Sequence, residues 1–125
     1  MMLVGPYSIP NVVANVTGVY TNTSPVDAYR GAGRPEATYV VETLIDNAAN
    51  ELGLDPSEIR SRNLVRSDQI PYQTPTGLVF DSGDFPAHFE KALERARYFS
   101  FRERQQKSLQ QGKRRGIGIS NYVEA

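Results

Sequence analysis

The sequence predicts an α+β fold, with about three helices packed on a small mixed or antiparallel sheet. Two observations indicate this class. Apolar residues recur with helical spacing over residues 35–52 and again from 85 to 99. Residues 12–20 and 116–123 instead have the composition or the alternation of strands. The order of the strands in the sheet does not follow from these patterns.

The first strand is expected over residues 12–20, where β-branched and aromatic side chains dominate and only Gly18 interrupts them. A loop is expected next, over residues 21–33, because residues that favour turns accumulate there. The loop residues of this kind are Asn22, Ser24, Pro25, Asp27, Gly31 and Gly33.

A long helix is predicted from Pro35 to Leu52, with one apolar stripe. Pro35 suits the first helical turn, Glu36 complements the positive end of the helix dipole, and Gly53 occupies the place of a left-handed C-cap. Acidic residues on this helix follow its spacing, and we interpret them as surface or structural groups. These residues are Glu36, Glu42, Asp46 and Glu51.

A second, shorter helix is predicted to start at Asp55-Pro56-Ser57-Glu58, with Asp55 as N-cap and Glu58 as the reciprocal partner of a capping box. Residues 67–83 carry turn signals around short extended pieces such as 78–80 and favour a hairpin.

A third helix is predicted after its N-cap, Asp84. A polar continuation over residues 102–111 is expected to project into solvent, and Gly112 ends it. A last strand over residues 116–123 would place Ile117, Ile119, Asn121 and Val123 on one side. The apolar face of the third helix comprises Phe85, Phe89, Ala92, Leu93, Ala96 and Phe99.

Composition excludes several classes of function. Lys and Arg together number 14, as do Asp and Glu, so the chain lacks the basic excess of a nucleic-acid-binding protein. The absence of cysteine excludes disulfides, thiolate zinc sites and cysteine-ligated iron–sulfur clusters on this chain, and it fits a cytoplasmic location. No segment approaches the roughly 20 apolar residues that span a membrane. The single histidine, His88, is interpreted as structural, and we assign no catalytic residue and no metal ligand.

One segment, residues 27–36, has a composition that suits chemistry. Gly31 and Gly33 flank an alanine, so the main chain can approach a ligand closely. The expected helix start adds unpaired amides, and Arg30 and Arg34 add two guanidinium groups. This combination favours binding of an oxyanion, a phosphate or a metal-oxo group.

Neither common nucleotide motif fits this segment. A dinucleotide-binding fingerprint would need glycine where Glu36 stands, and no Gly-Lys-Ser/Thr sequence occurs. On spacing alone the alternative is a tight loop whose arginines pair with acids such as Asp27 or Glu36.

Residues 28–37, Ala-Tyr-Arg-Gly-Ala-Gly-Arg-Pro-Glu-Ala, closely resemble the active-site loop of molybdenum hydroxylase large subunits, the family of xanthine dehydrogenase, aldehyde oxidase and carbon monoxide dehydrogenase. The resemblance covers essentially the full chain and is greatest to bacterial chains of the carbon monoxide dehydrogenase large-subunit type. Further landmarks of the family follow in order at residues 7–11, 19–22, 53–56, 60–64, 81–85 and 115–119.

The resemblance implies that residues 1–125 are a single segment of a larger molybdopterin-binding domain, truncated at both ends. It implies molybdopterin, in the cytosine dinucleotide form, in the intact subunit, and no tightly bound cofactor on this segment alone. FAD and iron–sulfur clusters would lie on partner subunits, and the substrate would be a small molecule. The cofactor-binding residues it implies are Tyr29, Arg30, Gly31, Ala32, Gly33 and Arg34.

One position departs from the copper-containing carbon monoxide dehydrogenases. Members of that type carry a cysteine directly after the loop arginine to hold copper, whereas this chain has Gly31 there. The resemblance therefore leaves hydroxylation of an aldehyde, a purine or an N-heteroaromatic compound at least as well supported as oxidation of carbon monoxide.

The resemblance also implies that the chain is inactive alone, because the glutamate that acts as general base in intact relatives lies beyond Ala125. Apolar faces that would meet the rest of the large subunit should make the segment self-associate. The alternative hypothesis is a stand-alone anion- or nucleotide-binding or oligomerising module without redox activity.

Overall fold

The computed structural model describes residues 3–123 and confirms the α+β class. Its two strands pair antiparallel, with Tyr72 opposite Phe80, and form the small sheet that the sequence predicts. In chain order the elements are α1 (Arg34–Leu52), α2 (Pro56–Asn63), the 3-10 turn η1 (Ser67–Gln69), β1 (Tyr72–Gln73), β2 (Val79–Phe80), α3 (Phe85–Ala96), the 3-10 turn η2 (Tyr98–Ser100) and α4 (Phe101–Gln110).

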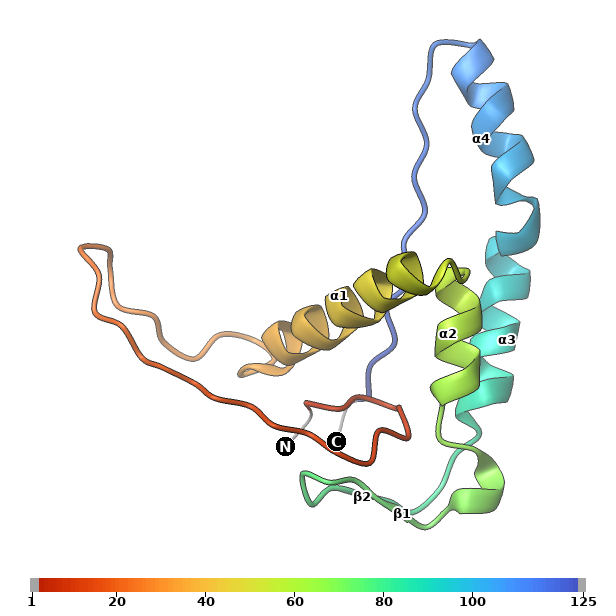
Figure 1. Cartoon of the computed structure of the whole chain (residues 1–125). Coiled ribbons are helices and arrows are strands. Elements are labelled where there is room, and N and C mark those ends of the chain that lie inside the picture. Colours follow the sequence, from red (N-terminus) through yellow and green to blue (C-terminus); the bar gives the residue numbers. More distant parts are fainter. Residues whose placement is uncertain (1–2, 124–125) are drawn as a thin grey trace.

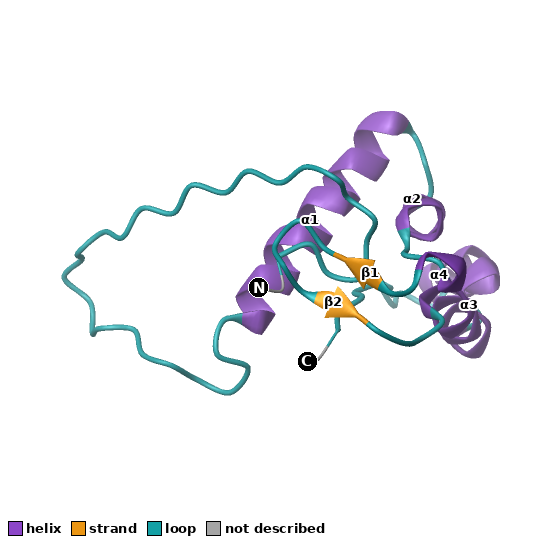
Figure 2. Ribbon diagram, turned by 90° about the horizontal axis from the view of Figure 1, so that it is seen from below, coloured by secondary structure: helices purple, strands orange, loops and turns teal. Residues whose placement is uncertain are grey.

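The arrangement is open on one side. In Figure 1, α3 and α4 follow one another as a long column with α2 beside α3, and α1 runs away from this column. The chain after α4 returns past α1 toward the N-terminal turn. Figure 2 shows that the segment before α1 forms a wide loop away from the helices.

Helix α1 begins one residue before the predicted position and ends where the sequence indicates. Pro35 lies in its first turn and Glu36 is the acidic residue there. Gly53 adopts the left-handed conformation, with φ of 66°, and its amide donates back to the last turn of the helix. Local signals alone were sufficient for this element.

Helix α2 confirms its predicted N-cap. The Asp55 carboxylate accepts hydrogen bonds from the Ser57 amide at 2.7 Å and from the Ser57 hydroxyl at 2.6 Å. The predicted reciprocal bond from Glu58 is replaced by a different partner, because the Glu58 carboxylate accepts from Arg62 one turn later.

Helix α3 begins as predicted, with the Asp84 carboxylate accepting from the Ala87 amide at 3.0 Å. It ends at Ala96 because Arg97 turns to φ of 50°, and the polar continuation forms the separate helix α4. The placement of Phe99 on the apolar face of the third helix was wrong. Phe99 lies in η2, after the break, and is 78% exposed.

The core lies between α1, α2, α3 and the N-terminal turn. Tyr7 is fully buried and forms an isolated antiparallel bridge with Leu64 at the end of α2. Val41 of α1 and Phe89 and Leu93 of α3 complete the cluster. Partly buried residues around it are Leu3, Ile9, Ile45, Phe85, Tyr98 and Ile119.

The predicted strand over residues 12–20 was wrong for this chain. The segment is irregular, and Val13, Val16 and Tyr20 are 90%, 93% and 104% exposed. A strand requires a neighbour that takes up its main-chain hydrogen bonds, and no described residue pairs with this segment. Strand propensity without a partner leaves an extended loop.

The predicted strand over residues 116–123 was also wrong. The alternation of its side chains nevertheless predicted which of them face the core. The segment has no strand assignment. Ile119 nevertheless packs against the core, and Asn121 hydrogen-bonds to Tyr7, on the side that the pattern assigned to both. Among residues 3–123, no helix has the length and apolar character needed to cross a membrane.

Candidate functional site

The turn at residues 31–33 has an unusual main chain. Gly31, Ala32 and Gly33 all have positive φ, at 93°, 45° and 91°. The Ala32 amide donates to the Tyr29 carbonyl at 2.8 Å, and the Arg34 amide donates to the Gly31 carbonyl at 2.9 Å. The chain therefore reverses direction tightly just before α1.

Gly31 is required by both conformation and space. A Cβ at this position would lie 2.6 Å from Cδ of Pro35, well inside van der Waals contact. Its φ also belongs to the region that glycine adopts without steric cost. The turn consequently folds directly over the first residues of α1.

The start of α1 is electropositive. Gly33 is the N-cap and supplies no side-chain hydrogen bond to the first turn. Amides at a helix start carry a partial positive charge that favours an anion. Arg30 is exposed beside this helix end and adds a guanidinium group.

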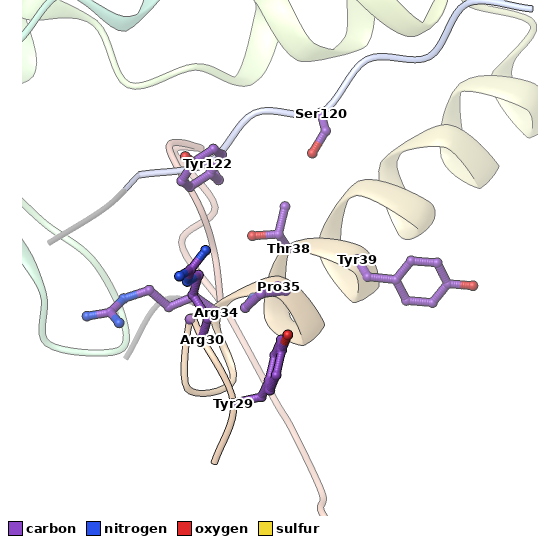
Figure 3. A pocket seen from close by; sticks show the side chains of 9 residues that line it. Tyr29, Arg30, Arg34, Pro35, Thr38, Tyr39, Ser120 and Tyr122 are labelled. Atoms are coloured by element: carbon purple, nitrogen blue, oxygen red, sulfur yellow. The ribbon is translucent and has the colours of Figure 1, made fainter. Parts of the chain in front are cut away.

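A cavity of about 790 Å³ lies beside the turn. Figure 3 shows Tyr29, Pro35 and Thr38 on one side of it, and Ser120 and Tyr122 on the C-terminal segment opposite. Tyr29 is 87% exposed, so this side of the turn is open. The full lining is Tyr29, Arg30, Gly31, Arg34, Pro35, Thr38, Tyr39, Ser120 and Tyr122.

The structure thus brings four of the six predicted site residues to one cavity: Tyr29, Arg30, Gly31 and Arg34. The other two, Ala32 and Gly33, shape the turn beside the cavity.

Sequence reasoning did not assign five lining residues to the site: Pro35, Thr38, Tyr39, Ser120 and Tyr122. Thr38 could have been found, because it lies one helical turn after Arg34 and so shares its face. Ser120 and Tyr122 carried a weaker signal, as the polar side of the alternating segment.

A buried polar cluster is centred on Arg60, which is fully buried. Its guanidinium donates to Glu42 at 2.9 Å, to Asp46 at 2.8 Å and to the Ile119 carbonyl at 3.3 Å. Burial alone would lower the pKa of Arg60, but the hydrogen bond to Asp46 and the charge of Glu42 outweigh it and raise that pKa. The interpretation of Glu42 and Asp46 as structural groups is confirmed.

Tyr7 connects this cluster to the C-terminal segment. Its hydroxyl donates to Glu42 at 2.6 Å and accepts from the Asn121 amide group at 3.2 Å. Burial, followed by the bond to Glu42, raises the pKa of Tyr7 well above its usual value. The hydroxyl therefore stays protonated at neutral pH and remains a donor.

No metal-binding cluster of histidine, cysteine and carboxylate residues occurs in the described part of the chain. His88, interpreted as structural, lies on an exposed face of α3.

An open glycine turn at a helix start, with a guanidinium group and a cavity beside it, is an arrangement typical of sites that bind an anionic ligand. Comparison with known families identifies the family to which the chain belongs. The molybdopterin cofactor-binding domain family matches residues 1–64, about half of the chain, and the chain belongs to this family.

Individual relatives support the same family assignment. The chain is 37% identical to the 6-hydroxypseudooxynicotine dehydrogenase complex subunit gamma of Paenarthrobacter nicotinovorans, over 96% of this chain and 16% of the relative. It is 41% identical to the carbon monoxide dehydrogenase large chain of Hydrogenophaga pseudoflava, over 81% of this chain and 13% of the relative. The chain thus corresponds to one part of a molybdenum hydroxylase large subunit.

A solved structure supports the same assignment. Quinoline 2-oxidoreductase from Pseudomonas putida 86 superposes with a TM-score of 0.71 and 34% identity, over 88% of this chain and 14% of that chain. This likeness extends beyond the family match at residues 1–64 and includes most of the described elements.

Proposed function

We propose that residues Tyr29 to Arg34 bind the molybdopterin cofactor, in its cytosine dinucleotide form, in the intact large subunit of a molybdenum hydroxylase. The observation that carries the proposal is the turn of three residues with positive φ at an N-cap without a side-chain cap, open to a cavity. The family match supports the identity of the ligand.

The residues present fit an anionic cofactor. Gly31 lacks the side chain that would collide with Pro35, so the turn can lie flat against the helix start. Arg30 supplies a charged donor at the cavity, and the positive end of the α1 dipole lies at the same turn. Donors fixed toward a site where negative charge develops contribute a few kcal/mol.

When bound, the molybdenum cofactor supplies the redox chemistry of hydroxylation. This chain's own contribution is to bind and orient the cofactor, and Tyr29 adds an aromatic surface to the cavity. Tyr29 could pack against the cofactor or the substrate, or it could be an ordinary packed aromatic residue of the intact domain.

The proposed reaction is hydroxylation of an aldehyde, a purine or an N-heteroaromatic compound. Gly31 occupies the position at which the resemblance places a copper-holding cysteine, so we do not propose oxidation of carbon monoxide. Relatives named for nicotine and quinoline favour the N-heteroaromatic class.

The proposed partners are the rest of the large subunit and separate subunits that carry FAD and iron–sulfur clusters, in the cytoplasm. Two relatives are named as a complex subunit and as a large chain, which supports assembly with other subunits. This chain has no cysteine, so it cannot supply thiolate ligands to a cluster. Alone, it should show no turnover.

The test is Arg30→Ala in the full-length subunit, with bound molybdenum and turnover as the two measurements. Loss of a group beside the metal centre should reduce one or both by about 10- to 100-fold. Arg66→Ala is the control, because Arg66 is an exposed arginine paired with Asp68 away from the cavity. Unchanged molybdenum content and kinetics in Arg30→Ala would remove the assignment.

Calorimetry on the 125-residue chain tests the alternative of a stand-alone module. The probes are inorganic phosphate, sulfate and nucleotides. Micromolar binding of any of them by the isolated chain would favour that alternative over the proposed function.

A further inference from the structure

The C-terminal segment, residues 117–123, faces the turn across the cavity and alternates between two environments. Ser120 and Tyr122 line the cavity (Figure 3). Their neighbours Ile119 and Asn121 point the other way, toward the core and Tyr7. With a two-residue alternation of this kind, one row of side chains is anchored in the core while the other row faces the cavity.

Two hydrogen bonds fix this segment on either side of Ser120. The Arg60 guanidinium donates to the Ile119 carbonyl at 3.3 Å, and the Asn121 amide group donates to the Tyr7 hydroxyl at 3.2 Å. Arg60 and Tyr7 are both fully buried, so the two anchors rest on groups that are themselves held in the core.

The direction of the hydrogen bonds requires a donor side chain at position 121, and Asn121 supplies it. Tyr7 has one hydroxyl proton, which it donates to Glu42 at 2.6 Å. The Tyr7 oxygen can therefore only accept from residue 121, and a carboxylate there has no proton to donate.

We infer that Ser120 and Tyr122 form the second wall of the cofactor site, and that Asn121 is the positioning residue that holds this wall against the turn through Tyr7. The identity of the ligand rests on the proposed function; the anchoring of the wall does not. Tyr122 presents a phenol ring and Ser120 a hydroxyl group to whatever occupies the cavity.

The first experiment is Asn121→Asp in the 125-residue chain, which keeps the shape, removes the donor and places a negative charge near Glu42. Amide order parameters from nitrogen-15 relaxation report the local effect. Values near about 0.85 mark a rigid backbone and values below about 0.6 a flexible one. We expect residues 119–122 to fall from the first range toward the second.

The matched control is Asn63→Asp, the same chemical change in an asparagine that donates to the Ile59 carbonyl in α2. This variant should leave the order parameters of residues 119–122 unchanged. If Asn121→Asp does not fold, Asn121→Ala removes the donor without adding charge and is measured in the same way.

Two results would overturn the anchoring. One is wild-type order parameters at residues 119–122 in both Asn121 variants. The other is an equal loss of order in Asn63→Asp, which would show a general loosening of the chain.

The second experiment tests the wall in the full-length subunit, where Asn121→Asp should lower bound molybdenum by at least several-fold. Unchanged molybdenum content, with Arg30→Ala still showing a loss, would overturn the second wall while the proposed function stands. No loss in Arg30→Ala would instead remove the proposed function, and the relaxation data would still decide the anchoring.

Discussion

Arg60 has no exposed side-chain surface, and its guanidinium donates hydrogen bonds to three parts of the chain. It donates to Glu42, Asp46, the Pro56 carbonyl and the Ile119 carbonyl. A charge without water must be compensated by partners of this kind, because its desolvation costs several kcal/mol. The bonds therefore fix α1, α2 and the C-terminal segment relative to one another.

We predict that Arg60→Met destabilises the chain by about 3–5 kcal/mol, since it leaves the buried Glu42 carboxylate without its counter-charge. Urea unfolding followed by circular dichroism measures the loss. The control is Arg62→Ala, whose ion pair with Glu58 is largely exposed and is expected to contribute about 0–1 kcal/mol. Equal losses in the two variants would contradict the structural role of Arg60.

At the scale of elements, capping groups determine where the helices begin and end. The Asp55 carboxylate caps α2 through Ser57 and also accepts from the Tyr98 hydroxyl at 3.0 Å, so it joins α2 to η2. Burial raises the pKa of Asp55, but the hydrogen bonds from Ser57 and Tyr98 together outweigh it and lower the pKa below its ordinary value. The ionised form is thus the one that stabilises the fold.

The second prediction concerns acid. A carboxyl whose pKa is lower in the folded chain stabilises fully above its unfolded pKa and loses this contribution as pH falls through the folded value. Asp55→Ala should therefore cost about 0.5–2 kcal/mol at pH 7, and the difference from wild type should shrink below pH 3.8. Urea titrations at several pH values measure it.

Asp27→Ala is the control for this prediction, because the Asp27 carboxylate accepts from the adjacent Ala28 amide in an exposed loop. The free energy of unfolding of Asp27→Ala should be close to that of the wild type at every pH. A wild-type minus Asp55→Ala difference that stays constant down to pH 2 would refute the linkage.

The sequence predicted the strands less well than the helices. The hairpin formed because β1 and β2 lie close in sequence and can pair with each other. Residues 12–20 have stronger strand composition, yet no described residue pairs with them. A helix completes its own hydrogen bonds, whereas a strand depends on a neighbour that its own sequence does not specify.

At the scale of the whole molecule, a run of exposed apolar side chains lies on the segment before α1, whose wide loop is seen in Figure 2. Val13, Val16, Val19 and Tyr20 are 75% to 104% exposed. Apolar side chains on an extended, unpaired main chain are a template for pairing with another chain.

The third prediction is that the chain self-associates through this segment. Sedimentation velocity over a concentration series should show a weight-average mass that rises above 13.9 kDa. Val16→Lys should reduce the association, because it places a charge in the middle of the segment, whereas Val79→Lys, at an exposed position of β2, should have less effect. A clean monomer at all concentrations would count against the prediction.

The sequence by itself determined α1 with its C-cap, the N-caps of α2 and α3, the hairpin and the turn from Tyr29 to Arg34, because each depends on residues within a few positions of one another. Only the tertiary structure decided that Thr38, Tyr39, Ser120 and Tyr122 share one cavity with that turn. It also decided that Tyr7, Glu42, Arg60 and Asn121 form one buried network, and that residues 12–20 have no partner within the described chain. The physical reason is range: capping and helical periodicity act within one or two turns, while cavity walls and strand pairs join groups whose separation along the chain no local pattern records.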